Sequence, residues 1–310
     1  MDAAMPYRIA SAPCSFGVDD VLTDDAWMPE PDEMLDWMLG IGYTGTELGP
    51  RSYLGVGADA WARLFRRNLA LVGSFLPLHF AHAETFASEL GWLRDRTLEV
   101  KAASPDDSAP FIVLCDALDD PDRRRWSGRI AEHPEVVLDR AAADAFRDRL
   151  HRAGEVVRAA GLRAVIHPHA GTHLETDAEI ERIVDGLDPS LVGLCLDTGH
   201  FAYGGGDPAA RIRDYRAVLQ HVHIKDFAPH VLARVRAADG GLVEALKAGC
   251  FPALGDGATD FGAVVRALRA AGYDGWLVVE QDRSLRKEDT RADLVAQQRR
   301  NLAVIRAAGA

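Results

Sequence analysis

The stretch from Val192 to Asp226, VGLCLDTGHFAYGGGDPAARIRDYRAVLQHVHIKD, contains the pattern from which the fold follows. It begins with an apolar run, VGLCLD at 192–197, and ends with a second one, HVHIK at 221–225. Each run is short and ends in polar side chains, which is typical of a buried strand. Because the chain between the two runs is long enough for a crossover helix, we predict two parallel strands in a βα unit.

The same alternation of short β-rich runs and longer amphipathic stretches continues in both directions. Six further strands are predicted: RIASAP from Arg8, TGTEL to Leu48, LVGSFLP from Leu71, FIVLC from Phe111, AVIH to His167 and WLVVE to Glu280. Helical stretches between them include PDEMLDWMLGIG, ADAWARLFRRNLA and DRAAADAFRDRLHRAGEVVRAAG. Gly42, Gly161 and Gly272 each stand just before a strand, where a helix closes in a left-handed residue. Eight strands in this alternation predict an α/β fold, a single (β/α)₈ TIM barrel that spans residues 1–310.

A doubly wound open sheet is the alternative fold. It would usually carry a glycine-rich nucleotide turn after its first strand, whereas here that strand runs into PCSFGVDD. GYTGTELG and YGGGDP lack the spacing of a phosphate-binding loop and are interpreted as turns. The segment 227–260 is a long connection after the seventh strand, with an amphipathic piece at GGLVEALKAG. On a barrel, such a loop is expected to cover the active site.

Composition narrows the class of partner. The net charge of −12 disfavours a nucleic-acid partner, because such a surface repels phosphate. No segment approaches the ~20 apolar residues of a membrane span, and the N-terminus lacks the basic and apolar regions of a signal peptide. The four cysteines are scattered without CxxC spacing and are expected to be reduced thiols: Cys14, Cys115, Cys195 and Cys250. We therefore expect a cytoplasmic protein with neither a membrane nor a nucleic-acid partner.

Polar side chains follow four consecutive strands, at the ends that form the catalytic face of a barrel. They are His167 and His169 after the fifth strand, Asp197 and His200 after the sixth, His221, His223, Lys225 and Asp226 on the seventh, and Glu280 and Asp282 after the eighth. Imidazoles and carboxylates on adjacent strands are the ligand set of a divalent ion such as Mn²⁺, Co²⁺ or Zn²⁺. Strand alternation puts His221, His223 and Lys225 on one face, with Lys225 over the barrel mouth. Asp197 and His200, separated by a Thr-Gly turn, are predicted to face the same cavity.

Four residues elsewhere are candidates for contact with the substrate. Glu47 ends the second strand and either contacts the substrate or is solvated at the rim. Phe16, in the loop after the first strand, is a candidate stacking platform for a sugar ring. His79 either lines the pocket or belongs to a surface loop. Asp256 in LGDGATDF is a further candidate, whereas Asp260 in the same stretch is interpreted as a helix N-cap.

Seven segments together resemble the xylose isomerase-like barrel superfamily, and within it the inosose (2-keto-myo-inositol) dehydratases. They are APCSFGVDD, GYTGTELGP, HPHAGTHLET, LCLDTGHFAYGGGDP, HVHIKD, FPALGDGATDF and GWLVVEQD. DTGH, HVHxKD and the GDG loop are common across the superfamily. Their order, together with the H-x-H-x-G-T stretch, indicates the dehydratase branch. The resemblance covers both ends of the chain and nearly all of residues 160–285.

The resemblance implies a barrel that binds one divalent metal, Mn²⁺ or Co²⁺, with Zn²⁺ or Mg²⁺ as alternatives. Related sugar epimerases hold their metal with Glu, Asp, His and Glu from strands five to eight. Asp197, His223 and Glu280 match the last three of these positions. His167 occupies the first, where this chain departs from the epimerase pattern. The implied ligands are therefore His167, Asp197, His223 and Glu280.

The departure at His167 bears on the reaction. An epimerase uses two carboxylates on opposite faces of one carbon, and His167 breaks that symmetry. Because an imidazole can bind metal or protonate a leaving hydroxyl, the site favours elimination of water from a polyhydroxy ketone through an enediolate. Glu280 is then both ligand and base, and Lys225 adds positive charge beside the enolate oxygen. His167, His169 or His200 would donate the proton to the hydroxyl, and His169 is also expected to contact the substrate.

Three other functions compete with dehydration. A ketose isomerase or epimerase would use the same metal and enediolate. The abasic-site endonuclease branch of the superfamily needs more ligands and a basic face, which the net charge of −12 disfavours. A non-catalytic sugar-binding protein would not need these ligands and Lys225. The expected partner is a small sugar or cyclitol, and members of the superfamily often pair through their barrels, which implies a homo-oligomer.

Overall fold

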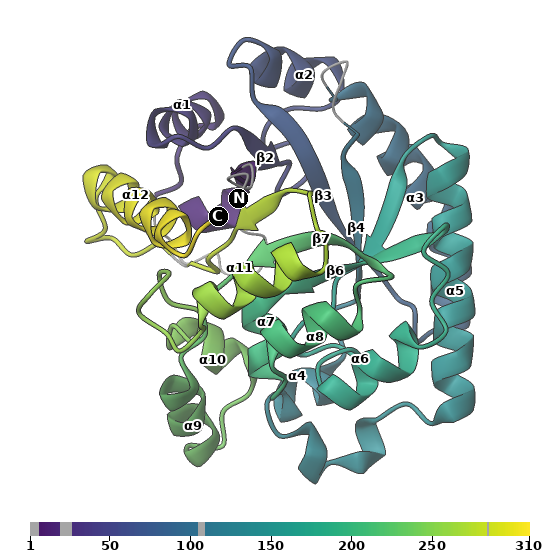
Figure 1. Ribbon diagram of the computed structural model, residues 1–310. Coiled ribbons are helices and arrows are strands. Elements are labelled where there is room, and N and C mark those ends of the chain that lie inside the picture. The colour runs from purple at the N-terminus through teal and green to yellow at the C-terminus, as the bar shows by residue number, and fades with distance from the viewer. Residues whose placement is uncertain (1–5, 19–26, 105–108, 284) are drawn as a thin grey trace.

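A computed structural model describes residues 6–18, 27–104, 109–283 and 285–310. Eight parallel strands form a closed barrel in which each strand pairs with the next and β8 pairs with β1 (Figure 1). The strands are β1 Ile9–Ser11, β2 Gly45–Glu47, β3 Ala70–Leu78, β4 Phe111–Asp116, β5 Arg163–Ile166, β6 Val192–Asp197, β7 Leu219–Ile224 and β8 Leu277–Val279. The predicted α/β barrel is confirmed, and the open-sheet alternative is excluded by the pairing of β1 with β8.

Helices surround the barrel and cover the outer faces of its strands (Figure 1). These outer helices are α1 Pro31–Ile41, α2 Ala58–Phe65, α3 Ala83–Ala102, α5 Arg140–Ala159, α6 Asp177–Val184, α8 Pro208–Asp214, α11 Phe261–Ala270 and α12 Arg291–Ala307. Gly42, Gly161 and Gly272 have φ values of 112°, 89° and 72°, so the predicted left-handed ends are confirmed. The predicted N-cap is confirmed too, because the carboxylate of Asp260 accepts from the N–H of Ala263 at the start of α11.

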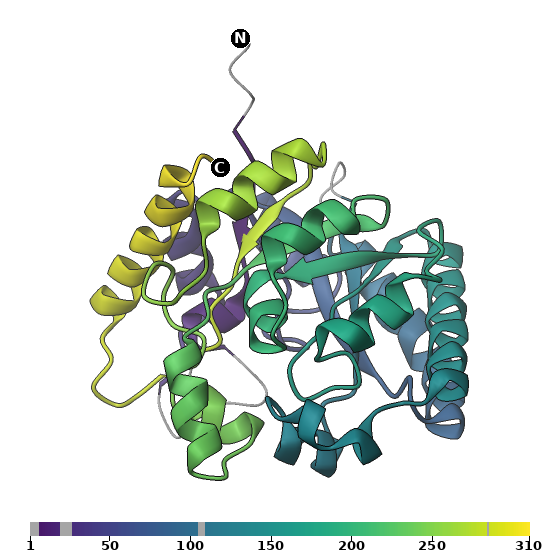
Figure 2. The same cartoon turned by 60° about the horizontal axis from the view of Figure 1, so that its bottom comes forward.

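Short helices gather at the end of the barrel where the strands finish. They are η1 Pro13–Phe16, α4 Pro121–Trp126, η2 Ile130–Glu132, η3 Pro134–Val136, α7 Thr198–Tyr203, α9 Pro229–Ala237 and α10 Leu242–Lys247. In Figure 2, α9 and α10 lie beside α4 at this end. The long segment 227–260 thus contains two helices, of which α10 coincides with the predicted amphipathic piece. Its Phe227 and Phe251 pack in an apolar cluster that also includes Tyr203 of α7 and Ala170.

Asp226 anchors this long segment to the barrel. Its two carboxylate oxygens accept from four backbone N–H groups, at distances of 2.8 to 3.1 Å: those of Phe227, Gly255, Gly257 and Thr259. A Cβ at Gly257 would lie 2.3 Å from the Asp226 carboxylate, so the GDG turn can approach it only as glycine. The segment therefore returns to the same strand end from which it leaves.

The inside of the barrel contains an apolar cluster. Phe111, Val113, Val165 and Cys195 pack together there, with Phe75 against them. A much larger apolar cluster fills the space between the strands and the helices. No disulfide joins the four cysteines, all of which lie in the described part of the chain. Among the residues that the structure describes, no helix has the length and apolarity required to cross a membrane.

Candidate active site

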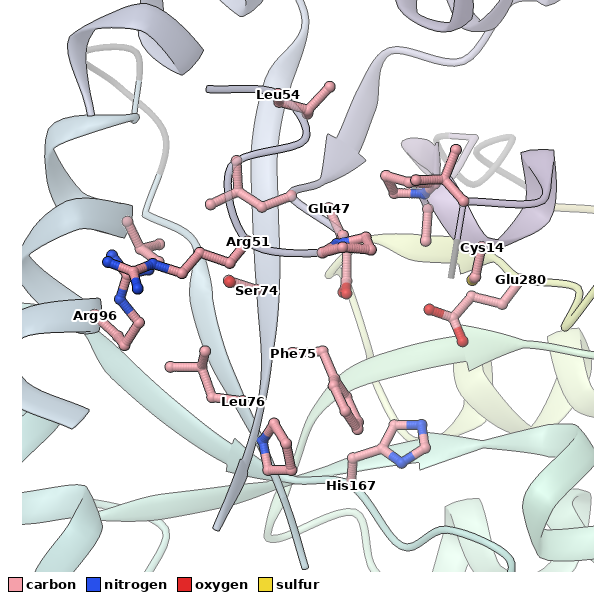
Figure 3. Close-up of a pocket in the computed structure, with 18 of the residues that line it drawn as sticks. Cys14, Glu47, Arg51, Leu54, Ser74, Phe75, Leu76, Arg96, His167 and Glu280 are labelled. Atoms are coloured by element: carbon pink, nitrogen blue, oxygen red, sulfur yellow. The ribbon is translucent and has the colours of Figure 1, made fainter. Parts of the chain in front are cut away.

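The four side chains implied as metal ligands meet at the C-terminal ends of β5 to β8. One ligand atom of each lies within 4.8 Å of those of the other three: His167, Asp197, His223 and Glu280. All four side chains are buried. The register of the sheet places Asp197 directly opposite His223, and His167 and Glu280 point into one cavity from either side (Figure 3). The geometric arrangement expected from the sequence is therefore present.

Glu47 fixes the orientation of His223. Its Oε1 atom lies 3.0 Å from Nε2 of His223 and 2.9 Å from Nε2 of His221. Burial raises the pKa of the Glu47 carboxyl, but the two imidazoles outweigh it and hold this pKa well below its usual range. Because an ionised carboxylate can only accept, both Nε2 atoms donate. Nδ1 is then the nitrogen of His223 that faces the cluster, 3.2 Å from Oε2 of Glu280 and 3.8 Å from Oδ2 of Asp197.

The inward position of Glu47 depends on the residue opposite it. The pairing of β2 with β3 shifts register between Thr46 and Glu47, and Glu47 then faces Gly73. A Cβ at position 73 would lie only 2.6 Å from Oε1 of Glu47. Glu47 is 2% exposed, so the alternative that it is solvated at the rim is wrong. The carboxylate supports histidines in the barrel, a role that the strand pattern alone did not indicate.

The cluster fits a divalent cation. Oδ1 of Asp197 accepts from the N–H groups of Gly199 and His200 at the start of α7. Within the described residues, Oδ2 of Asp197, Nδ1 of His223 and Nδ1 of His167 are buried without a hydrogen-bond partner. Leaving such atoms unsatisfied costs about 1–3 kcal/mol each. Two imidazoles and two carboxylates, three of them with an unsatisfied buried atom, form a ligand set suited to Mn²⁺, Co²⁺ or Zn²⁺.

Lys225 brings a positive charge to the same point. Its Nζ lies 2.8 Å from Oδ1 of Asp282, 3.2 Å from Oε2 of Glu280 and 3.4 Å from Oδ2 of Asp197. Burial lowers the pKa of Lys225, but these three carboxylates raise it well above its usual value. Thr198 holds the backbone of Lys225, donating its hydroxyl to the carbonyl and accepting from the N–H. The ammonium is therefore charged and fixed beside Glu280.

His169 and His200 are neutral. Burial, together with His167 and Lys225, lowers the pKa of His169 to about 3. Burial, His169 and Lys225 likewise hold the pKa of His200 well below its usual value. Nδ1 of His169 lies 2.8 Å from the Ala170 carbonyl, which can only accept, so its Nε2 keeps a lone pair. Neither imidazole carries a spare proton at neutral pH.

A cavity of about 730 Å³ opens over this cluster. Near the cluster it is lined by side chains from the barrel mouth: Glu47, His167, His169, His223, Lys225, Glu280 and Asp282. Phe75 meets the His167 ring edge-on, with 6.1 Å between the ring centroids (Figure 3). Leu242 and Leu246 of α10 also line the cavity, so the long segment after β7 lies over the site as predicted.

Four predicted contacts are not found. His200 does not line the cavity, because its Nε2 is turned to Nζ of Lys225 at 3.1 Å. Phe16 is fully buried. His79 lies between Glu89 and Asp119 outside the cavity, and Asp256 forms an ion pair with Arg300. Asp19 and Asp20 of the PCSFGVDD motif lie outside the described residues.

Sequence reasoning missed two supporting features. Asp282 was noted only as a strand-end carboxylate, whereas it makes the shortest contact of the Lys225 ammonium. Its position two residues after Glu280 was an available signal, because alternate residues share a face. Gly199 is the other: a Cβ there would lie 2.7 Å from Cγ of Lys225. Nothing in the DTGH stretch by itself shows which side chain needs that space.

The fold and the site define a class: (β/α)₈ barrels with a cluster of imidazoles and carboxylates at the mouth. The sequence model of the xylose isomerase-like TIM barrel matches residues 35–306, and the chain belongs to that family. The resemblance seen in the sequence is thereby confirmed.

Individual relatives agree with this assignment. The chain is 31% identical to the inosose dehydratase of Geobacillus kaustophilus (strain HTA426), over 89% of this chain and 88% of that protein. The inosose dehydratase of Geobacillus thermodenitrificans (strain NG80-2) is 40% identical, but the match spans 45% of this chain and 47% of that protein. A crystal structure of the IOLI protein with a bound zinc atom superposes with a TM-score of 0.71, at 14% identity over 97% of this chain and 98% of that one. At that identity the structural match shows a shared fold.

Proposed function

We propose that the chain is a metal-dependent dehydratase of a keto-cyclitol or a related polyhydroxy ketone. The observation that carries the proposal is the buried cluster at the barrel mouth, which combines unsatisfied ligand atoms with the Lys225 ammonium. The 31% identity to an inosose dehydratase over nearly the whole of both chains supports this reaction class.

His167, Asp197, His223 and Glu280 would hold the metal. A divalent ion at this position would acidify the C–H beside the ketone and stabilise the negative charge of the enediolate. The two imidazoles argue against Mg²⁺, which prefers oxygen ligands and keeps its water. Mn²⁺ and Co²⁺ are our first choices and Zn²⁺ is the alternative. The structural neighbour with bound zinc supports a divalent ion in this fold.

Glu280 is positioned to remove the proton from the carbon beside the ketone. Burial raises the pKa of its carboxyl, but His223 and Lys225 outweigh this and lower it to about 2. The side chain is thus ionised, and it lines the cavity. Oε of Glu280 would accept the proton as the carbon–hydrogen bond breaks.

Lys225 is the better donor to the departing hydroxyl. The sequence suggested a histidine, but His169 is neutral and His200 does not reach the cavity. Nζ of Lys225 would give a proton to the hydroxyl, which leaves as water when its carbon–oxygen bond breaks. Because Nζ lies 3.2 Å from Oε2 of Glu280, the proton taken by Glu280 can then return to Lys225. Acid and base stand side by side, so we expect both groups to leave from the same face of the ring.

Epimerisation is disfavoured by the same geometry. It needs a second base on the opposite face of the carbon, and His167 stands where the related epimerases have a carboxylate. Glu47 lines the cavity too, but its Oε1 already accepts from two imidazoles. A proton on this oxygen would compete with the N–H groups of His221 and His223, and so would release the two rings that Glu47 holds in place.

Turnover of 2-keto-myo-inositol by the protein loaded with Mn²⁺ or Co²⁺ tests the proposal. The product, read by mass spectrometry in deuterated water, should have lost one water molecule. Glu280→Gln should abolish the reaction, and the matched change at an exposed glutamate of α3, Glu84→Gln, should leave it intact. Products of unchanged mass would identify an isomerase or epimerase instead.

A further inference from the structure

The cavity extends past β3 into a second compartment that the proposed reaction does not use. Phe75 of β3 points toward His167, whereas Ser74 and Leu76 point to the other side of the strand (Figure 3). This outer compartment lies between the chain segment 51–57 and α3. Both compartments belong to one cavity of about 730 Å³. Cavities of roughly 300–1,000 Å³ hold drug-sized ligands, so the space exceeds what a single six-carbon ring needs.

The walls of the outer compartment are mostly apolar. They include Leu54, Val56, Leu76, Trp92, Val100 and Ala103. Two of these side chains stand exposed at its edge, Trp92 at 40% and Val56 at 39%. Exposed apolar side chains that line a cavity mark a place where apolar surface is buried on binding. A polyhydroxy ring would not cover such walls, whereas an aromatic or aliphatic group would.

Two arginines in the same compartment share one carboxylate. Arg96 of α3 is 6% exposed and pairs with Glu99. Nη2 of Arg51 lies 3.5 Å from Oε1 of the same glutamate. Burial lowers the pKa of Arg96, and the neighbouring Arg51 lowers it further. Glu89 of α3 lines the cavity too, but it is paired with His79, whose pKa burial lowers but Asp119 and Glu89 raise above its usual value. Arg51 and Arg96 against Glu99 then leave one positive charge in excess, in a chain whose net charge is −12. A single bound anion would balance it.

We propose that the ring ketone enters as a conjugate, whose substituent is apolar beside the ring and ends in a carboxylate held by Arg51 and Arg96. The ring lies at the metal cluster, and the substituent passes over the ends of β2 and β3, beside Leu48 and Pro77, into the outer compartment. A carboxylate fits better than a phosphate, because the excess is one charge and the walls are apolar. This inference rests on the proposed function because it places the ring at the metal cluster. It does not depend on which reaction the ring then undergoes.

Calorimetry on the metal-loaded protein tests this inference without turnover. The probes are 2-keto-myo-inositol and its mono-O-benzyl, para-carbamoylbenzyl and para-carboxybenzyl ethers. The benzyl ethers should bind at least about tenfold more tightly than the bare ketone, because they bury apolar surface. The carboxylate should bind at least about tenfold more tightly than its neutral carbamoyl isostere, since hydrogen bonds to charged groups are the stronger ones.

Variants locate the preference for the carboxylate. Arg51→Gln and Arg96→Gln should each remove most of the preference for the carboxybenzyl ether over the carbamoylbenzyl ether. The affinity for the neutral benzyl ether should change less than about twofold. Arg94→Gln, on the same helix but exposed and paired with Asp95, should keep the preference. The Arg51 side chain is 65% exposed, so that variant should fold even where replacement of the buried Arg96 does not.

The outcomes separate the inference from the proposed function. Equal affinity for the bare ketone and its ethers, or a carboxylate preference that survives the change at Arg51, would overturn the inference. Dehydration of the bare ketone without that preference would leave the proposed function standing alone. Binding with the preference, but without dehydration of any probe, would refute the proposed function and support the outer compartment.

Discussion

The carboxylate of Glu47 offers a sharp test of how the candidate metal site is built. It accepts from Nε2 of His223 and thereby turns Nδ1 of that ring toward Asp197 and Glu280. We consider two changes. Glu47→Gln removes the charge but keeps an oxygen acceptor, and Glu47→Ala removes the acceptor as well. If Glu47 fixes the ring, metal affinity should fall in that order.

The expected magnitudes follow from the contacts. Loss of a carboxylate that orients a ligating histidine costs about 10- to 100-fold in metal affinity, which is about 1.4–2.8 kcal/mol. Glu47→Gln should fall near the tenfold end, because its amide oxygen can still accept. Glu47→Ala should approach 100-fold, because the N–H groups of His221 and His223 both lose their acceptor in a buried place.

The assay is competition for Mn²⁺, Co²⁺ or Zn²⁺ against a chelator of known affinity. Thermal unfolding of the metal-free variants, measured in parallel, separates a weakened site from a damaged fold. Glu84→Ala, at an exposed position on α3, is the matched control and should bind metal as the wild type does. Wild-type affinity in Glu47→Ala would refute the reasoning, because His223 would then be oriented by something else.

Three further predictions concern the surroundings of the cluster. In Gly199→Ala the new Cβ would lie 2.7 Å from Cγ of Lys225 and would displace that side chain. We therefore expect kcat to fall roughly 10- to 100-fold with metal affinity unchanged. A normal kcat would contradict the assigned role of Lys225. Asp226→Asn turns an amide N–H₂ toward the backbone N–H groups that now donate to the carboxylate. The free energy of unfolding, measured in urea, should therefore fall by about 2–4 kcal/mol. A change below about 1 kcal/mol would show that the GDG loop is anchored elsewhere. Removal of metal with a chelator should lower Tm. Metal added at 100 times its Kd should raise the free energy of unfolding by about 2.7 kcal/mol. A Tm that responds neither to chelator nor to added ion would argue against the metal site.

The sequence predicted the barrel and the central cluster because both leave local signals. A buried strand is a short apolar run, and a polar residue at its end shows in the same few letters. HVHIK illustrates this: alternation alone puts His221 and His223 on one face, and both reach the same oxygen of Glu47. Once the strands close into a barrel, the ends of β5 to β8 must meet.

The parts that were not predicted depend on contacts between distant segments. Glu47 is buried because Gly73, on the next strand, leaves room for it after a shift of register. His79 directly follows β3, as the residues of the cluster follow their strands, but its loop turns it toward Glu89. Asp256 lies in the GDG loop, which turns it toward Arg300. The outer compartment is lined by Arg96 of α3, whose place on that helix does not distinguish it from the exposed Arg94.

The histidine at position 167 and the lysine at position 225 are linked by charge. Four buried or nearly buried carboxylates surround the candidate metal position: Glu47, Asp197, Glu280 and Asp282. A divalent ion and the Lys225 ammonium would supply three positive charges against these four negative ones. A carboxylate at position 167 would add a fifth negative charge in a place shielded from water, where unpaired charge is costly. An imidazole there completes the ligand set without adding a negative charge, so the acid and the base can remain together on one side of the ring.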